Sequence, residues 1–428
     1  MNFSQKQIML VGMGAALLVL IVVLVFFNLQ PSKTGQIQLT VWGFEKSDVI
    51  GGLVGGYNQF RPNVSVSYKQ VSKDNYENTL LSALASGQGP DVFPVHNRAL
   101  AKNLNVLSPS TASQFSQSQM DNLFPLEVGQ DFALIAADTA EKQVYALPLY
   151  FDTLSLIYNK DLFDQGGVAN PPATWEEFQA DISKLRNLSP NGQIVKASAA
   201  IGGSQKTVVN AVDILNVLML QNGVAMISGK YASFASEPGL GAFNFYLQFA
   251  NPASNYYTWN ESQPKDFDSF SAGNTAMIFG YNSDIQKIKS KSPFLRLGVA
   301  SLPQVNTSNA VNYADYWGLA VSKQSKNPSW AWDFVVNMAT QPRIAEQYSS
   351  ITGQPPALRE LISQKINDPT LGIFAKQALT ARSWNKPDEN LANGIFNDAI
   401  VSALGNQSNT REILSRAQAQ VTKLMNSQ

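Results

Sequence analysis

The sequence predicts an α/β fold in which parallel sheets are covered by helices on both faces. Strands and helices alternate from residue 36 onward, and the alternation returns near residue 270 after a largely helical middle. The chain has 428 residues, of which 44% are hydrophobic, so it can fill the cores of two domains of ordinary size. Sheets of this kind bind ligands beyond the carboxyl ends of their strands.

The first elements follow from the hydrophobic period and from chain breakers. Pro62 ends one helical stretch, and Gly87 ends another. Strict alternation of apolar and polar residues indicates the strands between them. The expected order is a strand at 36–42, a helix at 49–60, a strand at 64–71, a helix at 75–86 and a strand at 91–95.

The segment 147–178 combines a strand and a capped helix. Apolar residues alternate through Tyr158, and a pair of prolines at 171–172 then breaks the chain. Thr174 can cap the next helix, and Glu177 can reach back to the Thr174 amide. This pattern predicts a capping box.

Later elements are expected on the same grounds. The turn at 405–410 separates two amphipathic stretches, so the tail 397–425 predicts a helical hairpin with Thr410 as a cap. Trp330 and Trp332 fall inside a predicted helix and are expected in the core. The further elements are helices in 174–250, a helix end, a glycine break and a buried strand within 270–281, strands at 297–303 and 316–323, and a helix at 328–338.

Composition excludes several classes of function. Lys and Arg number 31, Asp and Glu number 31, and the net charge is zero, so no field attracts nucleic acid. Cysteine is absent, which excludes disulfides and thiolate metal sites. His96 is the single histidine and is expected to be a hydrogen-bonded loop residue. We expect no cofactor and no metal.

The N-terminus carries an apolar run from Ile8 to Leu29 without a charge. Its length reaches the ~20 residues that a membrane helix needs and exceeds the core of a signal peptide. Residues 1–35 are therefore interpreted as an uncleaved signal anchor and linker, with the body on the extracytoplasmic side. A long, cleaved signal peptide is the alternative.

Five motifs carry a resemblance to a known family. They are LTVWGFEK at 39–46, ASGQGPDVF at 85–93, SLIYNKDLF at 155–163 with PP.TWEEF after it, FSAGNTAMIFGY at 270–281, and YWGLAVSKQSKNPSWAWDFV at 316–335. Together they resemble the extracellular solute-binding proteins of bacterial ABC importers. Within these, they are similar to the carbohydrate-binding family that includes the maltose-binding proteins.

The resemblance implies a two-lobed, type II periplasmic-binding-protein-like fold whose lobes are joined by a hinge, with the ligand between them. The resemblance also implies that the chain crosses between the two lobes three times, near Leu149, Gly318 and Gly353. Lobe 1 would comprise 36–149 plus 318–354, and lobe 2 would comprise 150–317 plus 355–428.

Candidate ligand-binding residues follow from the matched positions, because sugars need aromatic platforms and planar polar groups. Asp152 is the foremost candidate. Asn97 departs from the family pattern, which has an acid there, so maltose itself is in doubt. The full set is Trp42, Glu45, Lys46, Asn97, Arg98, Tyr150, Asp152, Tyr281, Tyr316, Trp317 and Trp384.

The leading hypothesis is a membrane-tethered receptor that closes on a sugar and delivers it to ABC permease subunits, without catalysis. A monomer is expected. The alternatives are a ligand-sensing ectodomain, a binding protein for a polyamine or polyol phosphate, and a glycosidase that uses Asp152 with Glu45 or Asp284.

Overall fold

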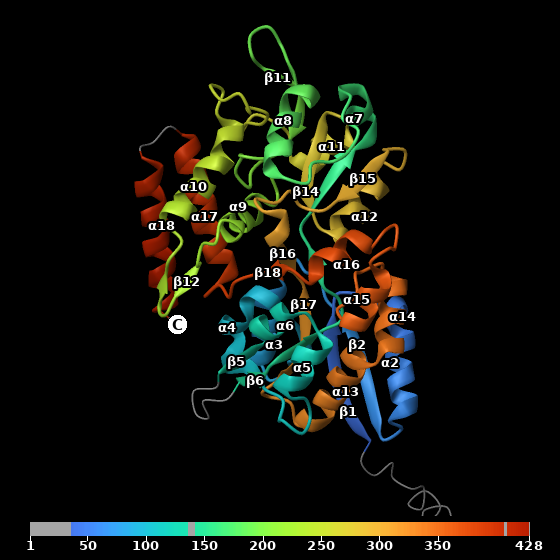
Figure 1. The fold of residues 1–428 in the computed structure, drawn as a ribbon. Coiled ribbons are helices and arrows are strands. Elements are labelled where there is room, and N and C mark those ends of the chain that lie inside the picture. Colours follow the sequence, from blue (N-terminus) through green and yellow to red (C-terminus); the bar gives the residue numbers. More distant parts are fainter. Residues whose placement is uncertain (1–35, 136–141, 406–408, 428) are drawn as a thin grey trace, which may run out of the picture.

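Two groups of elements lie one above the other in the computed structural model, which describes residues 36–135, 142–405 and 409–427 (Figure 1). The predicted signal anchor lies outside these residues. Within the described part of the chain, no helix is both long enough and apolar enough to cross a membrane.

The first group, in the lower half of Figure 1, is built on a six-stranded sheet. The strand order is β2-β1-β3-β17-β4, and β7 also pairs with β17. The strands are β1 (Ile37–Gly43), β2 (Val64–Gln70), β3 (Val92–His96), β4 (Leu107–Ser108), β7 (Ala146–Pro148) and β17 (Trp317–Ser322). The helices are α2 (Ser47–Phe60), α3 (Tyr76–Ala85), α4 (Leu100–Asn103), α5 (Gln117–Leu123), α6 (Leu126–Asp131), α13 (Pro328–Thr340), α14 (Pro342–Thr352) and α15 (Arg359–Lys365). A small hairpin joins β5 (Ala133–Ile135) to β6 (Lys142–Val144).

The second group is built on a five-stranded sheet of order β10-β11-β14-β9-β15. Its strands are β9 (Ser155–Asn159), β10 (Asn187–Leu188), β11 (Ile194–Ala199), β14 (Thr275–Gly280) and β15 (Leu297–Ala300). Outside this sheet, β12 (Ile227–Ser228) and β13 (Tyr231–Ala232) pair as a short antiparallel hairpin. The helices are α7 (Lys160–Gly166), α8 (Trp175–Leu185), α9 (Ala211–Gln221), α10 (Glu237–Leu247), α11 (Asp266–Ser271), α12 (Asn282–Lys291), α17 (Glu389–Leu404) and α18 (Thr410–Met425). Short 3₁₀ helices are η1 (Asn97–Ala99), η2 (Leu104–Val106), η3 (Gln248–Ala250) and η4 (Thr307–Asn309).

Both large sheets are mixed, so the prediction of two parallel sheets was wrong. β1 is parallel to β2 and β3, but β17 is antiparallel to β3, β4 and β7. In the second sheet β11 is parallel to β14, whereas β9 is antiparallel to both neighbours. β9 and β17 each follow a connecting strand directly, so no crossover helix precedes them to impose a parallel direction.

A three-stranded sheet of order β18-β16-β8 lies between the two groups (Figure 1). Its strands are β8 (Asp152–Thr153), β16 (Asn312–Asp315) and β18 (Ala381–Arg382), and α16 (Gly372–Ala378) contacts β8 and β16. Along β16, Tyr313 packs into one hydrophobic core and Ala314 into the other.

The two hydrophobic cores define a first lobe and a second lobe. The first core takes residues from 39 to 151 and from 314 to 362, and the second takes residues from 154 to 313 and from 384 to 421. The segment between residues 362 and 384 contributes to both, with Ala375, Ala378 and Ala381 in the first core and Leu371 and Phe374 in the second. Residues 357–362 pack into the first core. The lobe boundaries drawn from the sequence stay a prediction.

Helix termini explain where several elements begin. Thr174 accepts a hydrogen bond from the Glu177 amide at 3.1 Å, and the Glu177 carboxylate accepts from the Thr174 amide, which confirms the capping box. The tail forms the expected hairpin of α17 and α18. Thr410 is not the cap, however, because the Asn409 side chain accepts the Arg411 N–H at 3.1 Å and Thr410 is already helical.

Candidate ligand-binding cleft

Strand register brings two chemistry-bearing segments together between the lobes. β3 ends at His96, and Trp317 at the start of β17 pairs with it. Asp315 on β16 lies two residues earlier and pairs with Asp152 of β8. The carboxyl end of β3 therefore faces the strands that connect the lobes, which is where sheets of this kind bind ligands.

Aromatic side chains form a cluster at this end of the first lobe. The ring of Trp317 makes edge contacts with Phe44, Tyr76 and His96, with centroids 4.8, 5.6 and 4.9 Å away. The Tyr76 hydroxyl donates to the Pro94 carbonyl at 2.8 Å, which fixes that ring against β3. Trp317 itself remains half-buried, so part of its indole is open to a ligand.

A pocket of about 440 Å³ opens beside this cluster. Its volume falls in the usual range for small-molecule sites. Carboxylates, amides and an ammonium group surround the indole, so donors and acceptors lie next to an apolar face. The lining residues are Lys73, Asn75, Tyr76, Glu77, Asn78, His96, Trp317, Glu389 and Asn390.

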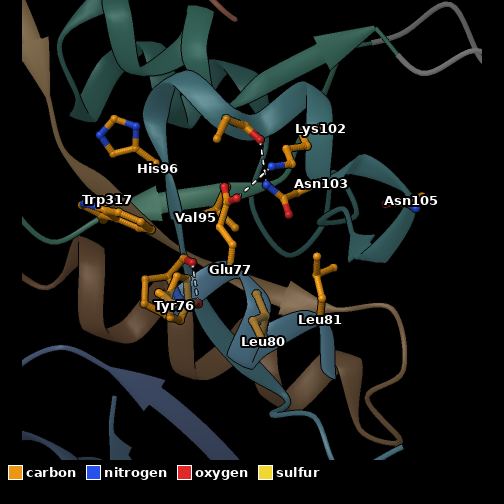
Figure 2. A pocket seen from close by; sticks show the side chains of 12 residues that line it. Tyr76, Glu77, Leu80, Leu81, Val95, His96, Lys102, Asn103, Asn105 and Trp317 are labelled. Carbon is orange, nitrogen blue, oxygen red and sulfur yellow. Dashed lines mark hydrogen bonds and ion pairs between the residues drawn. The ribbon is translucent and has the colours of Figure 1, made fainter. Parts of the chain in front are cut away.

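A smaller recess of about 140 Å³ adjoins the pocket and shares four of its residues. Figure 2 shows Trp317, His96 and Tyr76 grouped on one side of it. Glu77 and Lys102 meet on the other side, where Lys102 Nζ lies 2.8 Å from Glu77 Oε2.

Ion pairs connect the lobes behind the pocket. His96 Nε2 lies 2.9 Å from Asp315 Oδ1, and His96 Nδ1 lies 2.6 Å from Glu389 Oε2. Arg98 Nη2 lies 2.8 Å from Asp315 Oδ1, and Arg98 Nε lies 2.8 Å from Glu389 Oε1. Asp213 of α9 lies 3.6 Å from the same guanidinium. His96 and Arg98 are thus held between three carboxylates.

These contacts determine the protonation of the cluster. Burial alone would lower the pKa of His96, but the carboxylates of Glu389 and Asp315 outweigh it and raise the pKa to about 9. Burial would raise the pKa of Asp315, but His96 and Arg98 lower it to about 2. The pKa of Glu389 is likewise held well below its usual value. Burial, followed by the charge of Arg98, lowers the pKa of Lys386 to about 8.

A second polar network supports the connecting strands. Asp131 accepts hydrogen bonds from Asn97 Nδ2 at 3.0 Å and from the Tyr316 hydroxyl at 2.6 Å. It also accepts the Ser383 hydroxyl at 2.5 Å, while Glu127 accepts the Ser383 N–H. Burial raises the pKa of Asp131 to about 6, and burial together with the charge of Asp131 raises the pKa of Glu127 to about 8.

Comparison with known proteins assigns the family. The family model described as "Bacterial extracellular solute-binding protein" matches residues 46–342. The chain belongs to this family. Membership implies that the folded body is extracytoplasmic.

Relatives and solved structures agree with the assignment. A maltotriose-binding protein of Pyrococcus abyssi is 23% identical over 81% of this chain and 73% of its own. A multiple sugar-binding protein of Streptococcus mutans is 22% identical over 77% and 78%. The solved sugar-binding protein MalE of Xanthomonas citri has a TM-score of 0.74, 18% identity and coverage of 91% and 98%. The cyclic alpha-maltosyl-1,6-maltose binding protein of Arthrobacter globiformis has a TM-score of 0.75, 17% identity and coverage of 92% and 100%. These structures establish the type II periplasmic-binding-protein fold.

Several of the predicted site residues of this solute-binding protein meet in the cleft. Trp317 lines the pocket. Burial raises the pKa of Tyr150 well above its usual value, and the Trp317 backbone N–H opposes that rise. Arg98 reaches Asp213, which also accepts the Tyr281 hydroxyl at 2.7 Å. Their contact with a ligand stays a prediction.

Other predicted residues have mainly internal partners. Asn97 and Tyr316 are fully buried and bind Asp131. The Trp384 indole is buried in the second lobe, where Nε1 donates to Asn216 Oδ1 at 3.0 Å. These contacts position the cleft walls.

The predicted residues at the end of β1 and just after it lie in different environments. Trp42 is buried in the first core, with Lys69 Nζ 4.7 Å from its ring centroid. Glu45 accepts a hydrogen bond from the Tyr348 hydroxyl, and Lys46 is exposed at the start of α2. Neither Trp42, Glu45 nor Lys46 lines the pocket beside Trp317.

Asp152 is buried and serves the connecting strands. Its Oδ1 accepts the N–H of Thr153 at 2.8 Å and the N–H of Asn282 at 3.2 Å. Burial raises its pKa well above the usual value, although the Asn282 N–H opposes the rise. Asp152 thereby ties β8 to the start of α12.

Sequence reasoning missed the acids that hold the cluster. Asp315 directly precedes the recognised pair Tyr316 and Trp317, so that adjacency was an available signal. Glu389 and Asp213 lie on α17 and α9, more than 100 residues of sequence away from β3, and no local pattern marks them. Only the fold brings them to His96 and Arg98.

Proposed function

We propose that this protein is a membrane-tethered, extracytoplasmic receptor of an ABC importer that binds an uncharged sugar or oligosaccharide between its lobes. The observation that carries the proposal is the pocket in which the half-buried Trp317 indole lies beside Glu77, Glu389 and Asn390. An aromatic face covers the C–H face of a sugar ring, and neighbouring carboxylates and amides accept or donate to its hydroxyls.

The charge balance of the cleft supports an uncharged solute. The cations His96 and Arg98 are already paired with Asp315 and Glu389. An anionic ligand would have to displace these carboxylates from His96 and Arg98, and a cationic ligand would compete with pairs that are already formed. The names of relatives, maltotriose-binding and multiple sugar-binding, point to the same ligand class.

Binding rather than hydrolysis is proposed for this cleft. A glycosidase needs two carboxyl groups that flank the bond to be cleaved. Asp152 instead accepts two backbone N–H groups, and Asp284 caps α12 by accepting the Tyr281 N–H at 3.1 Å. Both acids are engaged in holding the backbone.

Delivery to permease subunits and tethering through Ile8–Leu29 complete the proposal. Family membership and the uncharged, apolar character of that run support them. A single tethered copy, acting as a monomer, would capture its solute close to the membrane and hold it for the permease.

Thermal unfolding tests the proposal. The full chain, purified in a mild detergent, is heated with a panel of neutral mono- and oligosaccharides, and with uronic acids, amino sugars, polyamines and phosphorylated polyols. A solute that binds only the folded state raises the unfolding midpoint. At a solute concentration one hundred times Kd, the free energy of unfolding rises by about 2.7 kcal/mol. A rise with neutral sugars alone is expected. A rise with polyamines or phosphates but with no neutral sugar contradicts the ligand class.

A further inference from the structure

We propose that the ion pairs joining His96 and Arg98 to Glu389 form a latch that holds the two lobes closed in the absence of solute. The proposal deepens the proposed function, on which it rests only in placing the solute in this cleft. Closure itself is measured without any sugar, so the latch and the ligand class are tested separately.

The latch has one half in each lobe. His96 and Arg98 follow β3, whose Val95 packs in the first core. Glu389 begins α17, whose Phe396 packs in the second core. The Glu389 carboxylate uses both oxygens, with Oε1 2.8 Å from Arg98 Nε and Oε2 2.6 Å from His96 Nδ1. One carboxylate therefore bridges two cations of the opposite lobe.

Neighbouring contacts reinforce the same closure. Lys102 of α4 lies 2.8 Å from Asp388, the N-cap of α17, and 2.8 Å from Glu77 of α3. Asn390 Nδ2 donates to Glu77 Oε2 at 3.4 Å. The start of α17 is thus held against α3 and α4 beside the pocket that a solute would enter.

The energetics allow such a latch to open. The net free energy gained by a buried ion pair is much smaller than the attraction between its charges, because that attraction is offset by their removal from water. When the lobes separate, the charges return to water and the cost of burial disappears. Removing one partner penalises only the closed form, since the remaining charge is then buried without compensation.

Protonation of His96 provides a test within the unmodified protein. Nε2 is hydrogen-bonded to Asp315, whereas Nδ1 lies 2.6 Å from Glu389 Oε2 without hydrogen-bond geometry, so only a protonated ring gives both carboxylates a positive charge to pair with. The pKa of His96 is raised to about 9, so the latch should weaken as the pH rises through that value. The ionisable groups around the ring, on its own segment and on the elements packed against it, are Arg98, Asp315, Glu389, Asp213, Lys386, Glu77, Lys73 and Lys102.

The absence of cysteine makes distance measurement across the cleft straightforward. Ser82→Cys on α3 and Asp398→Cys on α17 place one exposed attachment site on each lobe of the full chain. Single-molecule fluorescence energy transfer then reports the population of open molecules without sugar. Glu389→Gln should raise this population at least tenfold.

A matched control removes an ion pair within one lobe. Glu237 on α10 pairs with Arg411 on α18, and both helices belong to the second lobe. Glu237→Gln should leave the open population unchanged. Equal open populations in the parent protein and in a folded Glu389→Gln variant would overturn the latch, as would equal opening by both variants.

The pH series remains decisive if Glu389→Gln does not fold. The parent protein should open between pH 7 and pH 10 without loss of circular dichroism. His96→Gln should remove most of that pH dependence. A parent protein whose interlobe distance is constant from pH 7 to pH 10 would overturn the proposal, whatever sugars the protein binds.

Discussion

Replacing His96 by glutamine should remove a stabilisation that depends on pH. His96 is 7% exposed, and its imidazole lies between Asp315 and Glu389 at 2.9 and 2.6 Å. Burial lowers its pKa, yet the two carboxylates raise it from 6.5 to about 9. Glutamine has a similar reach but carries no charge, so it cannot reproduce the ion pairs.

The magnitude follows from linkage. A group whose folded pKa exceeds its unfolded pKa contributes stability that is fully present below the unfolded value and lost as the pH rises through the folded value. One pKa unit corresponds to about 1.36 kcal/mol, so the rise from 6.5 to about 9 contributes about 3 kcal/mol near pH 6. The stabilisation by protonated His96 is therefore lost between pH 6.5 and about pH 9.

Lys386 acts in the opposite direction. Burial and the charge of Arg98 lower its pKa from 10.5 to about 8, so its burial costs stability below pH 8 and that cost fades toward pH 10.5. The stability of the parent protein alone would mix the two effects. Lys386 is present in both the parent protein and His96→Gln, so the difference between their free energies of unfolding reports mainly the contribution of His96.

The assay is urea unfolding of both proteins at pH 6, 8 and 10. The free energy of unfolding should differ by about 3 kcal/mol more at pH 6 than at pH 10. A difference that stays constant over this range would refute the assignment of His96 as a protonated bridge between carboxylates.

Three further predictions concern the pocket, the buried acids and a helix cap. Trp317→Ala should weaken sugar binding about 10- to 100-fold in calorimetric titrations, whereas Trp330→Ala on α13 should leave it unchanged. Glu127→Gln should stabilise the protein by about 5 kcal/mol at pH 8.5 and not at pH 4.5, because the raised pKa of Glu127 makes its ionisation costly as the pH rises from 4.5 through about 8. Thermal midpoints at the two pH values test this, and an equal gain at both would contradict it. Thr174→Ala should lower the free energy of unfolding by about 1 kcal/mol in urea titrations, and an unchanged value would show that the capping box is dispensable.

Local patterns predicted elements well where the controlling contacts are local. The capping box at Thr174 depends on residues three positions apart, and the sequence displays them directly. Strand direction is different, because β9 and β17 pair with strands that are distant in sequence. The N-cap of α18 could not be assigned from the sequence to a single residue. Asn409 and Thr410 are both good caps, and only the backbone geometry distinguishes them.

The site was predictable only in part, for a related reason. Trp317 was recognised because it lies in a motif of the resemblance, and it lines the pocket. Phe44, which lies two residues after the predicted Trp42, contacts Trp317 while Trp42 is buried in the core. Glu389 could not be found by period or spacing, because its partners are about 290 residues away in sequence.

The central claim is that a neutral sugar binds between the lobes, and a crystal structure of the complex tests it most directly. The full chain would be crystallised with the saccharide that most raises its unfolding midpoint. A sugar ring is expected against Trp317, with hydroxyls bonded to Glu77, Glu389 or Asn390. Density for the sugar on an outer face instead, such as the hollow beside Trp175 in the second lobe, would contradict the claim.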